Sequence, residues 1–111
     1  MPVSATDHIV ILVKDIESAI TNWQNLGCTL SHRATVDAVS IHQAFFLLDD
    51  GTFIELIAPS SEDSPLTKTL ESRGEGIHTL AMEVTDLEQS IAAMQEKGVQ
   101  VIGAGTDQTF V

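Results

Sequence analysis

The sequence is poor in three features that define common protein classes. Cys28 is its single cysteine, so a disulfide within the chain is excluded and a reducing cytoplasm is the expected location. No apolar run approaches the ~20 residues of a membrane-spanning helix. Residues 1–4 lack the charged and apolar parts of a signal peptide. We therefore expect a cytoplasmic protein with no membrane partner.

Positive charge is also scarce. Five basic residues face sixteen acidic ones, which gives a formal net charge of −11. Such a surface repels nucleic acid and anionic lipid, and it disfavours a polyanionic ligand such as a coenzyme A ester unless basic residues gather locally. No phosphate-binding loop, zinc-finger spacing or nucleophile elbow is present. The sequence therefore predicts a globular chain, 43% hydrophobic, that does not bind nucleic acid.

What the sequence does contain is an internal repeat. Residues 7–30 are typical of a strand, a helix and the start of a second strand, and the same order returns 71 residues later, as the match of Asp15 with Asp86 shows. Both aspartates are placed to cap the start of a helix. Gly27 and Gly98, again 71 residues apart, are placed to end the helices. The repeat predicts two related structural units.

Hydrophobic patterning and turn residues predict the other elements. We expect strands over residues 7–13, 28–36, 41–48, 52–58, 77–84 and 99–103. We expect helices over residues 15–26, about 64–73, and 86–97. The first unit is then βαβββ, whereas the second ends after βαβ. Either another chain completes the second unit, or the sheet keeps an open edge that favours association.

Two βαβββ units in tandem resemble the glyoxalase/bleomycin-resistance superfamily, also called vicinal oxygen chelate proteins. The resemblance extends over about residues 5–103. The segments most similar to the methylmalonyl-CoA epimerase branch are 8–16, 53–59, 63–66 and 73–78. The resemblance implies an α+β fold in which tandem βαβββ modules form a curled mixed sheet with helices outside.

The same resemblance implies a domain plan. The chain would be one glyoxalase-like domain over residues 1–111. Module one would occupy about residues 5–60, a linker helix about 64–73, and an incomplete module two about 76–111.

The resemblance further implies a divalent metal, such as zinc, cobalt, nickel or manganese, in the hollow of the curled sheet. It assigns the first ligand to His8 and the second to Glu55. The third ligand position falls on Thr79, next to His78, and the fourth would lie beyond Val111. We therefore expect a metal site that is incomplete within the chain.

Strand alternation gives an independent view of this site. His8 shares a strand face with Val10, and Glu55 shares one with Phe53 and Ile57. A carboxylate among apolar neighbours needs a metal, a histidine or an arginine, because an unpaired buried charge is costly. The expected ligand pocket contains Val10, Phe53, Ile57, Thr79, Ala81 and Glu83.

Two classes of function remain open. One is a methylmalonyl-CoA epimerase-like or glyoxalase-like enzyme, a metal-dependent isomerase or lyase that works through an enolate. No catalytic residue is assigned, because strand 28–36 offers His32 but no carboxylate, and His42 and Gln43 either line the hollow or face water. The alternative is a bleomycin-resistance-like dimer that has lost the metal and binds a small molecule without catalysis, or a remnant that only dimerises. We expect a homodimer, with strand exchange as one route to it.

Overall fold

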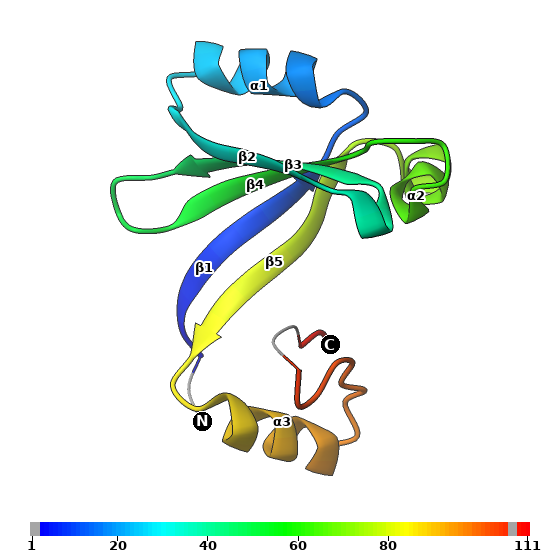
Figure 1. Cartoon of the computed structure of the whole chain (residues 1–111). Helices are drawn as coiled ribbons and strands as arrows, with labels where there is room; N and C mark the ends of the chain where they lie inside the picture. The colour runs from blue at the N-terminus through cyan, green and yellow to red at the C-terminus, as the bar shows by residue number, and fades with distance from the viewer. Residues whose placement is uncertain (1–2, 107–108) are drawn as a thin grey trace. The chain divides into compact units, whose positions relative to one another are not determined.

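The computed structural model describes residues 3–106 and 109–111 (Figure 1). Within them, five strands form one open mixed sheet in the order β2-β3-β4-β1-β5. The strands are β1 (Val3–Leu12), β2 (Leu30–Val36), β3 (Ile41–Leu47), β4 (Phe53–Pro59) and β5 (Gly76–Val84). The helices are α1 (Ile16–Asn25), α2 (Pro65–Arg73) and α3 (Leu87–Glu96), with one 3-10 turn, η1 (Asp37–Val39). The α+β class expected from the sequence is confirmed.

The sheet is mixed because β1 pairs with β4 in parallel, whereas β3 pairs antiparallel with both β2 and β4. A tight hairpin joins β3 to β4. Gly51 adopts a φ of +86° there, a conformation that glycine reaches without steric cost. The carboxylate of Asp50 accepts hydrogen bonds from the backbone and hydroxyl of Thr52 at 3.0 and 2.6 Å. These bonds hold the pKa of Asp50 below its ordinary value of 3.8.

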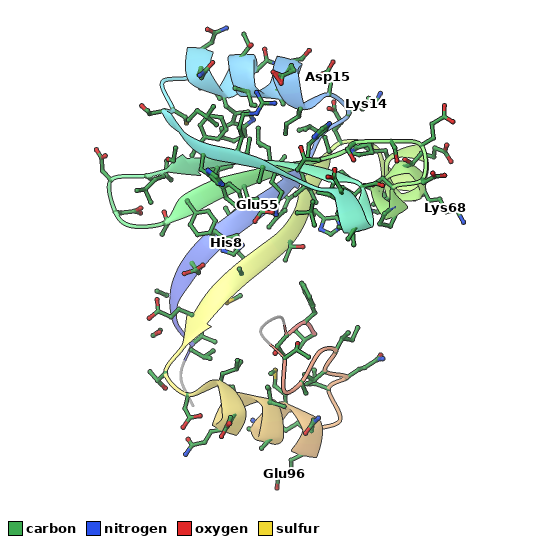
Figure 2. All side chains as sticks on the ribbon, viewed as in Figure 1. His8, Lys14, Asp15, Glu55, Lys68 and Glu96 are labelled. Carbon is green, nitrogen blue, oxygen red and sulfur yellow. The ribbon has the colours of Figure 1, made fainter. Side chains whose placement is uncertain are left out.

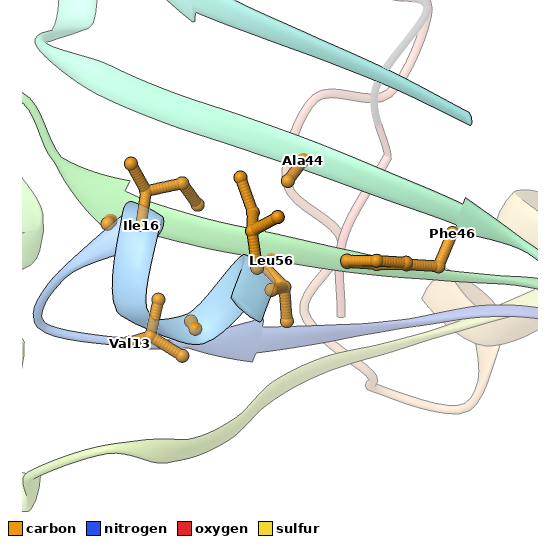
Figure 3. Close-up of a cluster of buried hydrophobic side chains, with 8 residues drawn as sticks. Val13, Ile16, Ala44, Phe46 and Leu56 are labelled. Carbon is orange, nitrogen blue, oxygen red and sulfur yellow. The ribbon is translucent and has the colours of Figure 1, made fainter. Parts of the chain in front are cut away.

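The main hydrophobic core lies between α1 and the sheet (Figure 3). Asp15 starts α1, because its carboxylate accepts the backbone N–H groups of Glu17 and Ser18. The apolar stripe of the helix then meets the odd-numbered positions of β1 and the even-numbered positions of β3 and β4. Its buried members are Val13, Ile16, Ala19, Ile20, Ala44, Phe46, Leu56 and Ala58. We name this side of the sheet the α1 face.

The opposite side, which we name the His8 face, carries a smaller core. Val10, Leu12 and Ile57 are buried there against Leu66 of α2. Ser64 caps α2 by accepting the backbone N–H of Leu66 at 3.2 Å. Since α2 covers only this group, the side chains nearer the start of β4 stay partly exposed.

The expected strand over residues 99–103 does not form. In that segment the structure has only an isolated bridge between Ile102 and Phe110. Gly103 adopts a φ of +79°, and its carbonyl accepts the backbone N–H of Thr106 at 3.0 Å. The chain therefore turns where the sequence pattern predicted an extended segment. β1 also begins earlier than expected, at Val3 instead of residue 7.

The chain divides into two compact units, which we describe separately. The first runs from Thr6 to Ala81 and includes α1, α2, β2, β3, β4 and most of β1 and β5. The second comprises Met82–Val111 with the start of the chain up to Ala5. No helix in the described residues is long and apolar enough to cross a bilayer.

Candidate functional site

His8 and Glu55 lie together on the His8 face of the first unit (Figure 2). Their strands, β1 and β4, are parallel neighbours in which His8 pairs with Phe53 and Val10 with Glu55. The imidazole Nε2 lies 3.7 Å from the Oε1 of Glu55. The side chains are 20% and 14% exposed, so both are partly shielded yet reachable from solvent. Alternation along the two strands is what brings both side chains to one face.

Three further contacts surround the pair. Asp7 Oδ2 lies 2.7 Å from Nδ1 of His8. The ring of Phe53 stacks on the imidazole, with centroids 4.2 Å apart and planes 10° from parallel. Gln43 of β3 donates a hydrogen bond from Nε2 to Oε2 of Glu55 at 3.2 Å. The histidine and the carboxylate are therefore each held by a polar neighbour on the side away from the other.

Gln43 is the part of this cluster that sequence reasoning did not resolve. Alternation separates it from His42, which lies near Thr35 with Nδ1 2.8 Å from the threonine Oγ1. The pairing of Gln43 with Ile57 places it diagonally next to Glu55. Only the pairing register of β3 with β4 shows whether His42 or Gln43 reaches the site. That register could not be predicted from the sequence pattern.

Four rings, one from each of four neighbouring strands, form a row on the His8 face. After His8 and Phe53 come Phe45, whose ring centroid is 6.1 Å from that of Phe53, and His32, 5.8 Å from Phe45. A register shift between Leu30 and His32 turns His32 toward this side. Two rings separate His32 from His8. His32 therefore does not reach the His8–Glu55 pair and does not replace a carboxylate there.

Two of the expected site residues on β5, Thr79 and Glu83, have hydrogen-bond contacts with residues other than His8 and Glu55. His78 Nδ1 lies 2.7 Å from Thr79 Oγ1, and the side chain of His78 is exposed. Glu83 is exposed in the second unit, where its backbone carbonyl accepts the hydroxyl of Ser4 at 3.2 Å. Val10 and Ile57 are buried in the small core under α2. A pocket that combines these residues with Thr79 and Ala81 stays a prediction.

The His8–Glu55 pair fits part of a metal site. Two ligand atoms about 2.1 Å from one cation lie roughly 3.0–3.4 Å apart at octahedral or tetrahedral angles. The observed 3.7 Å between Nε2 and Oε1 needs only a small side-chain rotation to reach that spacing. Catalytic sites commonly have three protein ligands. Among the described residues no group of three or more histidine, cysteine, aspartate or glutamate side chains is placed to hold a metal. Metal ligation by His8 and Glu55 therefore stays a prediction, and it would need further ligands.

Among the described residues, no lysine or arginine forms an ion pair with Glu55. Arg33 of β2 points to the α1 face, where it forms a two-pronged ion pair with Glu17. Two surface hollows of about 440 and 570 Å³ lie elsewhere, beside the start of α1 and along α2. The larger is lined by the acidic residues Glu62, Asp63 and Glu71 and by Lys68. Neither hollow is lined by His8 or Glu55.

Comparison with known proteins supplies the family. Residues 7–110 match the family model of the Glyoxalase/Bleomycin resistance protein/Dioxygenase superfamily. The uncharacterized protein YqjC of Bacillus subtilis is 35% identical over 97 residues, which cover 86% of this chain and 69% of the relative. Ethylmalonyl-CoA/methylmalonyl-CoA epimerase of Cereibacter sphaeroides is 32% identical over 101 residues, covering 89% of this chain and 75% of the relative.

Solved structures agree with these relatives. Methylmalonyl-CoA epimerase from Mycobacterium tuberculosis superposes with a TM-score of 0.78 at 33% identity, covering 90% of this chain and 68% of that one. An E43Q variant of the Streptomyces coelicolor epimerase, in complex with 2-nitronate-propionyl-CoA, gives 0.77 at 27% identity, covering 91% and 76%. The chain belongs to the glyoxalase/bleomycin resistance protein/dioxygenase superfamily, and its relatives and structural neighbours include methylmalonyl-CoA epimerases.

Proposed function

We propose that this protein is an isomerase of the methylmalonyl-CoA epimerase type, which moves the proton next to the carbonyl of a small acyl thioester. The observation that carries the proposal is the placement of His8 Nε2 and Glu55 Oε1 3.7 Å apart on one sheet face. Similarity to epimerases of Cereibacter sphaeroides and Mycobacterium tuberculosis supports the substrate class.

The reaction needs a group that polarises the carbonyl and groups that remove and return the proton. A divalent cation such as zinc, cobalt, nickel or manganese, held by His8 and Glu55 with further ligands, would supply the polarising charge. Gln43 restrains the carboxylate of Glu55, and Phe53 covers one face of the imidazole. Both contacts reduce the reorganisation needed when substrate arrives. No residue of this chain is assigned as the proton-transferring acid or base.

A second candidate is a non-catalytic module that binds a small molecule. It is favoured by the ring row of His8, Phe53, Phe45 and His32, which offers an aromatic platform on the same face. Aromatic side chains with a few polar groups are typical of small-molecule sites.

Exchange of the substrate α-proton tests the enzyme directly. The protein, purified without chelator and then loaded with Co²⁺, is incubated with methylmalonyl-CoA in D₂O, and deuterium uptake is followed by mass spectrometry. We expect exchange by the wild type and its loss in Glu55→Ala, with bound metal lost in parallel. Glu62→Ala, a change of an exposed loop glutamate, is the matched control and should exchange normally. An absence of exchange by the metal-loaded wild type would refute the epimerase proposal.

A further inference from the structure

We propose that Asp7 is a positioning residue, which fixes the tautomer of His8 so that the bare Nε2 faces Glu55. The inference rests on the proposed function, because it concerns the same pair, but it is a statement about the free protein and is measured without substrate. It assigns a role to a carboxylate that the family resemblance did not single out.

The hydrogen bond between Asp7 and His8 determines the tautomer of His8. An ionised carboxylate only accepts hydrogen bonds, so the contact of 2.7 Å between Asp7 Oδ2 and His8 Nδ1 requires a proton on Nδ1. A neutral imidazole carries one N–H, which leaves Nε2 with its lone pair. The 3.7 Å between Nε2 and Glu55 Oε1 is longer than a hydrogen bond, so no N–H is needed on that side.

The neighbours of the pair keep this arrangement in place. Phe53 sets the plane of the imidazole by stacking at 4.2 Å. Gln43 occupies Oε2 of Glu55, so that Oε1 is the oxygen nearest to His8. The unprotonated Nε2 of His8 and the Oε1 of Glu55, which does not accept the Gln43 hydrogen bond, therefore lie next to each other. That is the chemistry that a Lewis acid recognises, and partners of the outer ring nitrogen commonly tune ligand strength in this way.

Nitrogen NMR of the protein labelled with ¹⁵N at histidine measures the tautomer. Spectra are recorded at about pH 8.5, well above the ordinary imidazole pKa of about 6.5. We expect the wild type to show His8 protonated on Nδ1 and bare at Nε2. Asp7→Ala should shift His8 toward the Nε2–H form that free histidine favours in water. Asp7→Asn, whose amide oxygen still accepts, should restore the wild-type pattern.

Cobalt binding gives a second readout. Titration of the metal-free protein with Co²⁺ should show an affinity 10–100-fold lower for Asp7→Ala than for the wild type, with Asp7→Asn in between. Asp63→Ala, a change of an exposed loop aspartate, is the control and should bind as the wild type does. Asp7 is itself 48% exposed, so its replacement leaves the core intact. Unchanged signals from His32 and His78 verify the fold.

Two results would overturn the inference: an Nε2–H form of His8 in the wild type, or a tautomer that does not respond to Asp7→Ala. A failure of the proposed function is distinguishable from either. If the tautomer responds as expected but metal-loaded protein does not exchange the thioester proton, the positioning role stands and the epimerase proposal falls.

Discussion

Arg33 of β2 donates hydrogen bonds to Glu17 of α1 from both terminal guanidinium nitrogens, from Nη1 to Oε1 at 2.9 Å and from Nη2 to Oε2 at 2.5 Å. The pair links the first helix to the edge strand of the sheet, across 16 residues of sequence. Hydrogen bonds from Arg33 are the largest reason why the pKa of Glu17 lies below its ordinary value of 4.5. The same contact raises the pKa of Arg33.

This ion pair predicts an acid-sensitive contribution to stability. A carboxyl group whose pKa is depressed by folding stabilises the native state above its unfolded pKa and loses that contribution as pH falls through the folded pKa. We expect Arg33→Gln to be less stable than the wild type at pH 7, with the difference shrinking below about pH 4.5. Urea midpoints measured from pH 7 downward give both curves.

Lys68→Gln is the control for this measurement, because it removes one exposed positive charge outside the pair. Its difference from the wild type should not follow the titration of Glu17. A constant gap between the Arg33→Gln and wild-type curves across the acid range would contradict the prediction. High salt should weaken the effect as well, since the pair is exposed and screened.

The helix caps predicted by the internal repeat give a second prediction. Asp15 Oδ1 accepts two backbone N–H groups of α1, from Glu17 at 2.9 Å and Ser18 at 3.3 Å. Asp15→Ala should lower the free energy of unfolding by about 1 kcal/mol, whereas Asp15→Asn should cost much less, since asparagine also caps well. Thermal and urea unfolding measure both. Equal losses for the two variants would show that the cap is not the cause.

The repeat also shows how far the sequence determines the fold. Asp86, the counterpart of Asp15, caps α3 by accepting the backbone N–H of Gln89 at 3.1 Å. Caps, helix ends and strand faces follow from local chemistry, so they were predictable. The segment 99–103 was not, because its apolar residues permit a strand, whereas the structure has only an isolated bridge at Ile102 and a turn at Gly103.

The candidate site also has features that the sequence predicts and features that it does not. The common side of His8 and Glu55 follows from strand alternation. The partner of Glu55 does not, since Gln43 reaches it only through the pairing of β3 with β4. The orientation of His32 depends on a register shift that leaves no local mark in the sequence. Metal binding by His8 and Glu55 stays a prediction.

Two adjacent residues of β3 test the core. Phe46 is fully buried on the α1 face, whereas Leu47 is 60% exposed. Phe46→Ala should cost about 3–5 kcal/mol through lost burial and the cavity left behind. Leu47→Ala should change stability by less than about 0.5 kcal/mol. If Phe46→Ala does not fold, Phe46→Leu gives the graded result. Similar losses at both positions would contradict the assignment of the core.

The stack of Phe53 on His8 should contribute measurable coupling. A double-mutant cycle combines Phe53→Leu, which keeps an apolar side chain, with His8→Ala. We expect a coupling free energy of about 0.5–1.5 kcal/mol from urea unfolding, as for other stacked rings. Phe53→Leu with His42→Ala is the control pair, because His42 lies on the α1 face beside Thr35. Additivity within about 0.3 kcal/mol for the His8 pair would show no stack in solution.

Among the described residues β5 is an edge strand of the sheet, which predicts self-association. β5 is an outer strand of nine residues, and two of its apolar side chains in the first unit, Ile77 and Leu80, are 68% and 50% exposed. A long apolar edge strand invites pairing with another chain. We expect a homodimer by size-exclusion chromatography with light scattering, and a shift toward monomer in Leu80→Lys. Leu26→Lys, which adds the same charge at a 74% exposed leucine after α1, should leave the dimer intact.

A wild type that is monomeric at every concentration measured would contradict the prediction. If both variants are monomeric, the interface does not lie at β5.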